Sequence, residues 1–336
     1  MNIKQLAAHL GLSQATVSRV MNNAAAEHRI AAHTRERVLA AAATLNYEPN
    51  AFARGLRKKR SFTVGVMVPE ISEGYAATVL GGIGDSLLAE KFFYFVVSHR
   101  HRSELLESYP SLLLSRGVEG IIAVDTPIAN DWPVPIVAVS GNSKTSGVVT
   151  IELDHQSAAQ HALAHLVDLG HRRIAFIKGQ TFSADTHARW EGIRQVCQSL
   201  GIRIHPELVV QLEGITGSEP GYTATKKLLQ QGGQFTAIFA FNDISAIGAI
   251  GALHDAGLSV PADVSVIGFD DISSASTNNP ALTTVRQPLY EMGRSAASTL
   301  LRQITTGMTG EQPQSILISP CLVKRRSTQK VKLALD

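Results

Sequence analysis

The stretch GLSQATVSRVMN (Gly11–Asn22) decides the fold of the first part of this chain. An apolar face over residues 3–10 predicts a helix before it, and Gly11 is the residue type that most easily ends a helix in a left-handed turn. Ser13 then offers a side-chain oxygen that can cap a second helix, which the pattern predicts over residues 14–21. Two short helices joined by a tight glycine turn are therefore expected.

A third helix is predicted over roughly Thr34–Leu45, and it completes a small three-helix unit. Its inward side is expected to consist of Val38, Leu39, Ala42 and Leu45. On the second helix the apolar residues point inward. The face that is left outward is short and polar, and consists of Gln14, Ala15, Ser18 and Arg19. This plan is that of a helix-turn-helix domain, whose exposed helix suits the major groove of DNA.

The charge of the chain is divided unevenly between its parts. Residues 1–60 contain ten Lys and Arg against three Glu, which gives +7, whereas the whole chain carries +3. The remaining residues therefore carry 3 − 7 = −4. A basic segment on an acidic body indicates a polyanionic partner for that segment, although a charge run by itself is more often a solvated face.

From residue 62 onward, short apolar runs alternate with amphipathic stretches. The runs that predict strands are TVGVMV (63–68), FFYFVV (92–97), GIIAV (120–124), PIVAVS (135–140), VVTIEL (148–153), RIAFI (173–177), AIFAF (237–241) and VSVIGF (264–269). Helices are predicted near 76–90, 103–116, 156–169, 186–200, 222–231, 243–256 and 289–304. This alternation indicates an α/β core of two doubly wound lobes with parallel sheets. A ligand site is expected in the cleft between the lobes, beyond the carboxyl ends of strands.

Two segments, GLSQATVSRVMN and TRERVLAAAATLNYEPNAFARGLRKKRS (Thr34–Ser61), resemble the headpiece and hinge of the lactose-repressor (LacI/GalR) family. The spelling TVSRV-x-N followed by Y-x-PN-x-x-AR-x-L is highly specific. Residues 165–179, 237–271 and 280–297 resemble the core of that family, which has the periplasmic-binding-protein type I fold. The implied domains are an all-α helix-turn-helix headpiece (1–49), a hinge helix and linker (50–61), a two-lobed core (62–328) and a short tail (329–336).

The resemblance assigns DNA contacts residue by residue. It places Gln14, Ala15 and Arg19 at the base-reading positions, where arginine suits a bidentate contact to guanine and alanine only an apolar contact. The positions that hold the phosphate backbone and set register are Ser13, Thr16, Ser18, Asn22, Tyr47 and Asn50. In the hinge, Ala53 and Leu56 match minor-groove residues, and the leucine would wedge into the central base step. The alternative for Leu56 is an ordinary core residue.

The headpiece departs from the family pattern in two places. The segment NNAAAEHRIAAHT (22–34) is about three residues longer than the usual loop between the second and third helices, and its Glu27–Arg29 either adds a phosphate contact or lengthens a solvated loop. Ala31 replaces the usual Ser or Thr cap, which is expected to weaken the third helix by about 1 kcal/mol.

The resemblance also carries effector contacts over to the core. Arg189 stands at the arginine of the R-x-x-G pattern, here RWEG, and its planar group would bind ligand oxygens. Asn242 and Asp270 end or follow the strands AIFAF and VSVIGF, where they would take up hydroxyls of a polyol-like ligand. The further effector-binding positions are Tyr75, Ser157, Ile215 and Gln287.

Other features of the core have a structural interpretation. Asp243 and Asp271 are expected to cap helices rather than to bind a ligand. The stretch GGIGD (81–85) lies inside a helical segment and not after a strand, which favours helix packing over a nucleotide loop. The stretch SHRHR (98–102) is expected to be too exposed and isolated for a metal site.

The predicted function is sequence-specific transcription regulation by a repressor that a small molecule controls from the cleft. The resemblance implies a homodimer on a near-palindromic double-stranded operator, a sugar or sugar derivative as effector, a cytoplasmic location and no cofactor. Whether the effector is an inducer or a corepressor is left open. Because no leucine-heptad tail follows the core, a dimer is expected rather than a tetramer.

Two other classes of protein are weighed against this function. A solute-binding protein would need a secretory signal, which MNIKQLAAHLGLSQ does not resemble, and would have no headpiece. A Rossmann-like enzyme would need a strand–GxGxxG–helix unit, a Walker loop or a nucleophile–base pair, and the sequence shows none of these. A membrane protein is not expected either, because no run of about 18 apolar residues occurs.

Overall fold

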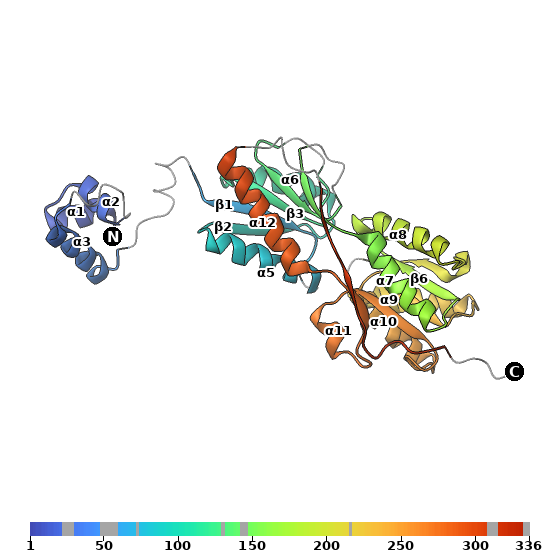
Figure 1. Cartoon of the computed structure of the whole chain (residues 1–336). Coiled ribbons are helices and arrows are strands. Elements are labelled where there is room, and N and C mark those ends of the chain that lie inside the picture. Colours follow the sequence, from blue (N-terminus) through green and yellow to red (C-terminus); the bar gives the residue numbers. More distant parts are fainter. Residues whose placement is uncertain are drawn as a thin grey trace. The chain divides into compact units, whose positions relative to one another are not determined.

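The computed structural model describes residues 1–21, 30–47, 60–71, 74–128, 132–141, 147–214, 217–307 and 315–331. The chain divides into two compact units, Met1–Phe62 and Thr63–Asp336, which are described separately (Figure 1). Within the described ranges, no helix is both long enough and apolar enough to cross a membrane.

The first unit is built from three short helices, α1 (Ile3–Leu10), α2 (Gln14–Met21) and α3 (Ala32–Thr44). Local side chains fix the ends of the first two helices. Asn2 and Gln5 form a reciprocal capping box at the start of α1, and Gly11 ends that helix with a φ of 65°. Ser13 Oγ accepts a hydrogen bond from Thr16 N at 3.1 Å and so caps α2. The buried core of the unit contains Leu6, Ala7, Val17, Val20, Val38 and Ala42.

One prediction for the third helix was wrong, although the bounds of the helix, Ala32–Thr44, lie within two residues of the approximate range predicted. Leu39 exposes 51% of its surface, so it is not a core residue. Val38 and Ala42 form the buried face of the helix. Leu39 lies one residue after Val38, about 100° further around the helix, and therefore points away from that face. Ala31 stands at the N-cap and makes no side-chain hydrogen bond there, as its apolar side chain predicts.

The second unit contains two sheets, each of which forms one lobe (Figure 1). The sheet of the first lobe has the strand order β11-β5-β4-β3-β1-β2, and its neighbouring strands are parallel. Its strands are β1 (Thr63–Val68), β2 (Phe93–Ser98), β3 (Gly120–Val124), β4 (Ile136–Val139), β5 (Val149–Leu153) and β11 (Ser315–Ile318). Its helices are α5 (Gly74–Ala89), α6 (Ser103–Ser115) and α12 (Leu289–Thr306). The strands β1, β3 and β4 are buried along their whole length, which explains why their sequences are continuously apolar.

The second lobe repeats this plan with the strand order β12-β10-β9-β8-β6-β7, in which only the β10–β12 pair is antiparallel. Its strands are β6 (Ile174–Lys178), β7 (Val209–Gln211), β8 (Ala237–Ala240), β9 (Ser265–Asp270), β10 (Thr283–Arg286) and β12 (Cys321–Val323). Its helices are α7 (His155–Asp168), α8 (Asp185–Ser199), α9 (Glu219–Gln230), α10 (Asp243–Asp255) and α11 (Ser273–Thr277), with a 3₁₀ turn at Pro206–Leu208. The chain passes between the lobes after β5, after β10 and after β11. The cleft between the lobes is therefore bounded by one sheet on each side and by these connections.

Glycines allow two pairs of helices to touch backbone to backbone. In the first lobe, a Cβ on Gly82 of α5 would overlap the carbonyl oxygen of Tyr290 at the start of α12, and one on Gly293 would overlap that of Val79. The two helices lie side by side (Figure 1). The prediction that GGIGD serves helix packing is therefore confirmed for Gly82. In the second lobe, α9 and α10 meet in the same way at Gly221 and Gly248.

Candidate functional site

Helix α2 presents its predicted base-reading residues to solvent. Gln14, Ala15 and Arg19 are all exposed. Val17 and Val20, on the other side of the helix, are buried in the headpiece core. The core residues therefore fix the helix so that its polar face is available to a partner such as the edges of bases in a groove.

The predicted backbone-contact residues lie in different surroundings. Ser13 and Thr16 stand at the N-terminus of α2 with their hydroxyl oxygens 2.9 Å apart, a position that favours a phosphate. Ser18 is half-buried. Tyr47 is only 9% exposed and packs in the headpiece core, so its ring supports the fold of the unit. Four predicted DNA-contact residues lie outside the described residues, namely Asn22, Asn50, Ala53 and Leu56.

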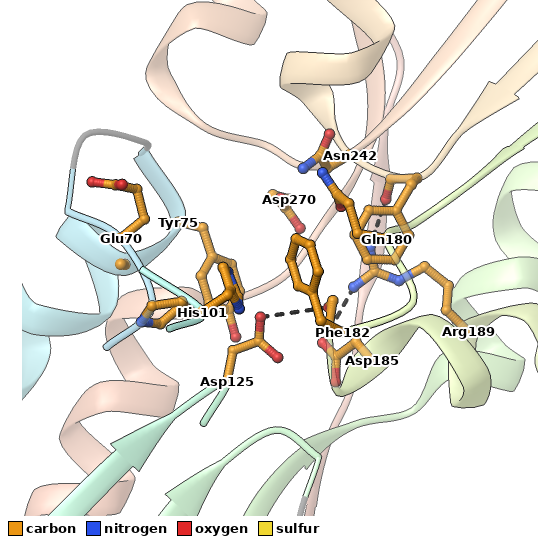
Figure 2. Close-up of a pocket in the computed structure, with 14 residues that line it drawn as sticks. Glu70, Tyr75, His101, Asp125, Gln180, Phe182, Asp185, Arg189, Asn242 and Asp270 are labelled. Atoms are coloured by element: carbon orange, nitrogen blue, oxygen red, sulfur yellow. Dashed lines mark hydrogen bonds and ion pairs between the residues drawn. The ribbon is translucent and has the colours of Figure 1, made fainter. Parts of the chain in front are cut away.

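A cavity in the second unit gathers residues from both lobes (Figure 2). Its empty space of about 660 Å³ includes open solvent. All but one of the lining residues end a parallel strand, follow one, or lie in the first turn of the helix after it, which is where ligands bind in such sheets; the exception, Arg189, lies one turn further along α8. The lining residues are Pro69, Glu70, Tyr75, Ala76, His101 and Asp125 of the first lobe, and Gln180, Phe182, Ser183, Asp185, Arg189, Phe241, Asn242 and Asp270 of the second.

Arg189 is held firmly in the wall of this cleft, with 4% of its surface exposed. Its guanidinium lies between two rings, 4.3 Å from the centroid of Phe241 and 3.7 Å from that of Phe269. Nη1 donates to the carbonyl oxygen of Phe241 at 2.5 Å, and Nη2 lies 3.3 Å from Asp185 Oδ2. Its Nε is buried without a hydrogen-bond partner. Since buried donors are normally satisfied, a ligand oxygen is a fitting acceptor for it.

Asn242 and Asp270 lie on the cleft, as the sequence predicts, and each is held by a neighbour. Asn242 Oδ1 accepts a hydrogen bond from Ser245 N at 2.9 Å, so this residue caps α10 and can offer its amide nitrogen to a ligand. Asp270 has a φ of 107°, a strained conformation of the kind that clusters at functional sites. Gln287 Nε2 donates to Asp270 Oδ1 at 2.6 Å. Gln287 does not line the cavity itself and orients a residue that does.

The two aspartates expected to cap helices do not cap them. Asp243 is wholly buried and accepts a hydrogen bond from Thr284 Oγ1 at 2.6 Å. Asp271 forms ion pairs of 2.7 Å with both Arg286 and Arg325. The cap of α10 is the asparagine before Asp243. Because these partners lie far along the chain, the local sequence could not reveal them.

Two other predicted effector residues differ in position. Tyr75 lines the cleft from the start of α5, and its hydroxyl lies 3.2 Å from Ser140 Oγ. Burial raises the pKa of Tyr75 well above its usual value, so the phenol is neutral. Ser157 does not line the cleft, because its hydroxyl donates to Asp154 Oδ2 at 2.6 Å at the start of α7. Ile215 lies outside the described residues.

Asp125 joins the two lobes and was not among the predicted site residues. It directly follows β3 in the first lobe. Its Oδ1 accepts a hydrogen bond from Ala184 N at 2.9 Å, and its Oδ2 accepts one from Ser183 Oγ at 3.4 Å, both in the second lobe. The rule that located Asn242 and Asp270, a polar residue at the carboxyl end of an apolar strand, applies equally to the aspartate after GIIAV.

Asp125 and Asp185 titrate together. Burial, and next the negative charge of Asp185, raise the pKa of Asp125 to about 7. Burial also acts to raise the pKa of Asp185, but His155 and Arg189 outweigh it and hold that pKa below its ordinary value. Near pH 7 Asp125 is therefore about half protonated, whereas Asp185 is ionised.

The SHRHR segment is less exposed than predicted. His99 is completely buried, and its Nε2 lies 3.0 Å from Thr126 Oγ1. The backbone N–H of His101 donates to His99 Nδ1 at 3.1 Å, and burial lowers the pKa of His99 to about 4. His99 is thus a neutral structural residue. The ring of His101 lies 3.9 Å from that of Phe182, across the cleft. In the described part of the chain, no three His, Cys, Asp or Glu residues are placed to hold a metal ion.

Comparison with known proteins gives both units a family. Residues 2–50 match the model for bacterial regulatory proteins of the lacI family, and residues 163–328 match a periplasmic binding protein-like domain. The chain is 32% identical to the HTH-type transcriptional repressor PurR of Haemophilus influenzae, over 98% of this chain and 99% of that protein.

Two solved structures extend this comparison. The lac repressor dimer bound to operator and the anti-inducer ONPF has a TM-score of 0.88 at 29% identity, over 98% of this chain and 99% of that one. The complex of the transcriptional regulator CelR with cellobiose has a TM-score of 0.72 at 27% identity, over 97% and 99%. With a relative of this identity matching almost end to end, the chain belongs to the lacI family of bacterial regulatory proteins.

Proposed function

We propose that this protein is a transcriptional repressor that binds a near-palindromic operator as a homodimer and is controlled by a small molecule in the cleft. The observation that carries the proposal is the combination, in one chain, of an exposed polar helix and a cleft lined by both lobes. The relatives support it, because one is named a repressor and the lac repressor is seen as a dimer on its operator.

Two headpieces are needed for specific binding, because each headpiece reads only one half-site. Gln14, Ala15 and Arg19 read base edges, while Ser13 and Thr16 hold the phosphate backbone at the start of α2. Residues 50–61 form the hinge, with Leu56 as the minor-groove wedge. This division predicts that the base contacts determine which operator sequence is bound, and that the basic headpiece supplies the salt-dependent part of the affinity.

The effector acts by favouring one arrangement of the two lobes. Asp125 already bonds to Ser183 and Ala184 across the cleft, so the closeness of the lobes depends on groups beside the cavity. A ligand in the cavity changes operator affinity only if it binds the DNA-competent and incompetent arrangements differently. A carbohydrate-like effector is supported by the CelR complex, whose ligand is cellobiose, and by Asn242 and Asp270 on the cleft wall.

Binding, and not catalysis, is the activity we propose. The relatives compared are regulators, and the arginine of the cleft is tied to Phe241 and Asp185. An operator-binding protein also acts where the DNA is, in the cytoplasm. Turnover of a nucleotide or nicotinamide by the purified protein would favour an enzyme instead.

Replacing Arg19 tests the reading of DNA. We expect Arg19→Ala to reduce the preference for one base pair in each half-site by about 1–3 kcal/mol, because a bidentate contact to guanine is lost. Arg19→Lys should keep most of the salt-dependent affinity but lose the same base preference, since its point charge lacks the fork. The measurement is selection of operators from a random library, followed by titration at two salt concentrations. An unchanged selected sequence with Arg19→Ala would show that Arg19 does not read DNA.

Replacing Asp270 tests the ligand site. A thermal-shift screen of sugars, sugar phosphates and nucleobases should find a compound that raises the melting temperature, because a ligand bound only by the folded state stabilises it. Asp270→Ala should weaken the binding of that compound at least about 30-fold, since a buried hydrogen bond to a charged group is lost. Asp255→Ala is the matched control, because Asp255 is exposed on the same lobe and lies outside the cavity. Equal shifts in the two variants would place the ligand elsewhere.

A further inference from the structure

Acidic side chains outnumber basic ones among the residues that line the cleft. Both lobes contribute carboxylates, Glu70 and Asp125 from the first, and Asp185 and Asp270 from the second. Among the described lining residues, these four acids stand against one arginine and one histidine. The acids are also close to one another, since the charges of Asp185, Asp125 and Asp270 all act on the buried hydroxyl of Tyr75.

Neither basic residue is placed to receive an anionic ligand. Arg189 is already neutralised by Asp185, bonded to the backbone of Phe241 and stacked between two rings. Burial lowers the pKa of His101, so this ring is neutral near pH 7, and it packs against Phe182. A phosphate or carboxylate group in the cavity would therefore meet several negative charges and no uncommitted positive charge among these residues.

The remaining walls of the cavity complement a cation. The rings of Tyr75, His101 and Phe182 lie in the same space as the carboxylates (Figure 2), and Phe241 lines this space as well. Aromatic faces attract ammonium groups, and more strongly where water is excluded. The amides of Gln180 and Asn242, with the unpartnered Nε of Arg189, suit hydroxyl groups. The wall thus combines a place for positive charge with places for hydroxyls.

The two carboxyls that face each other across the cleft show where the charge belongs. Burial, and next the negative charge of Asp185 in the second lobe, raise the pKa of Asp125 in the first lobe to about 7, so Asp125 is about half protonated near neutral pH. Because Asp185 already pairs with Arg189, a protonated amine placed beside the two carboxyls would add a positive charge next to Asp125 and favour the ionised form of Asp125, which loses its proton to solvent. The amine would also join one lobe to the other, which is what an effector must do.

We propose that the effector of this protein is a polyhydroxylated organic cation, of the amino sugar or amino polyol class, whose protonated nitrogen lies between Asp125 and Asp185. This inference rests on the proposed function only in taking the cleft as the effector site. It narrows the effector to cationic compounds and excludes sugar phosphates and sugar acids.

The test uses compounds that differ in charge on one skeleton. Glucamine, sorbitol and gluconate form an open-chain set, and glucosamine, glucose and glucuronate form a ring set. Calorimetry and thermal shift with the full-length protein should show the cation binding at least about tenfold more tightly than its neutral partner in one set or both. Raising the salt concentration should weaken the binding of the cation and leave the binding of the neutral compound unaffected. The inference is wrong if a neutral or anionic member binds best, or if no cation binds.

A variant and a change of pH locate the charge. Asp125→Asn should weaken the binding of the cation about tenfold or more and leave the binding of the neutral compound unchanged. Asp255 is exposed, and Asp255→Asn should alter neither affinity. Glucamine should bind more tightly as the pH rises from about 6 to about 8, because its amine stays protonated while Asp125, facing Asp185, Arg189 and Tyr75, loses its proton. Binding that ignores both changes would overturn the placement. If only a neutral sugar releases the operator, the proposed function stands and this inference is wrong. If the protein binds no operator, the proposed function itself is wrong.

Discussion

Gly248→Ala destabilises the second lobe by about 3 kcal/mol or more, one of the largest losses of stability that we expect from a single added methyl group among the described residues. Gly248 lies in α10, where a Cβ would overlap the carbonyl oxygen of Ser218 and come within 2.7 Å of Tyr222 N. Both obstacles are backbone atoms at the start of α9, so no side chain can rotate away. The two helices must separate, and the buried contacts between them are lost.

Gly251 supplies a matched control on the same helix. A Cβ there would meet only Tyr222 Cδ2 at 3.7 Å, an ordinary contact. Gly251→Ala should therefore be neutral or stabilising by up to about 1 kcal/mol, since alanine favours a helix over glycine. Urea denaturation of both variants at one protein concentration measures the difference. Equal midpoints for Gly248→Ala and Gly251→Ala would mean that α9 and α10 do not pack at this glycine.

Asp125→Asn stabilises the protein at about pH 8 and leaves its stability nearly unchanged at about pH 4. The folded-state pKa of Asp125 is raised to about 7 from an ordinary value of 3.8, so the folded state binds this proton more tightly than the unfolded state does. The contribution of the protonated Asp125 carboxyl to the free energy of unfolding is therefore present at low pH and is lost as the pH rises towards 7. Asparagine mimics the protonated acid, and each pKa unit is worth about 1.4 kcal/mol, so the gain at pH 8 should be roughly 2–4 kcal/mol.

The comparison needs unfolding curves at several pH values for the wild type, Asp125→Asn and Asp255→Asn. Asp185, Arg189, Tyr75 and Ser183 face Asp125 and remain in the variant, and its amide oxygen can still accept from Ala184 N. The gain should grow between about pH 4 and pH 7 and then level off. Asp255→Asn should follow the wild type. A gain that does not change with pH would show that the carboxyl of Asp125 has an ordinary pKa.

Much of the fold could be predicted because its signals are local. The capping residues Gly11 and Ser13 determine where the first two helices end and begin, and the continuous apolar runs became buried parallel strands. Four strands were missed, namely β7, β10, β11 and β12. These are only three or four residues long, and β10 (TTVR) is largely polar in sequence. Their place in the sheets depends on neighbouring strands rather than on their own composition.

Four of the predicted effector-binding residues line the cleft: the family resemblance pointed to Tyr75 and Arg189, and the ends of apolar strands pointed to two more. Asn242 and Asp270 lie on the cleft because their strands end there. Asp271, in contrast, was expected to cap a helix and instead pairs with Arg286 and Arg325, one of them 54 residues further along the chain. The contact of His101 with Phe182 and that of Asp125 with Ala184 join different lobes, so no local pattern announces them. Such contacts depend on how the two lobes meet.

The most direct test of the central claim, that the cleft controls the headpiece, is a two-way binding measurement. The affinity for the selected operator is measured with and without the compound whose thermal shift depends on Asp270. The affinity for that compound is then measured with and without the operator. The two ratios must be equal, and a factor of about 5 to 150 is expected, because coupling between sites is reciprocal. Ratios of one in both directions would show that the ligand and the operator bind independently, and would contradict the claim.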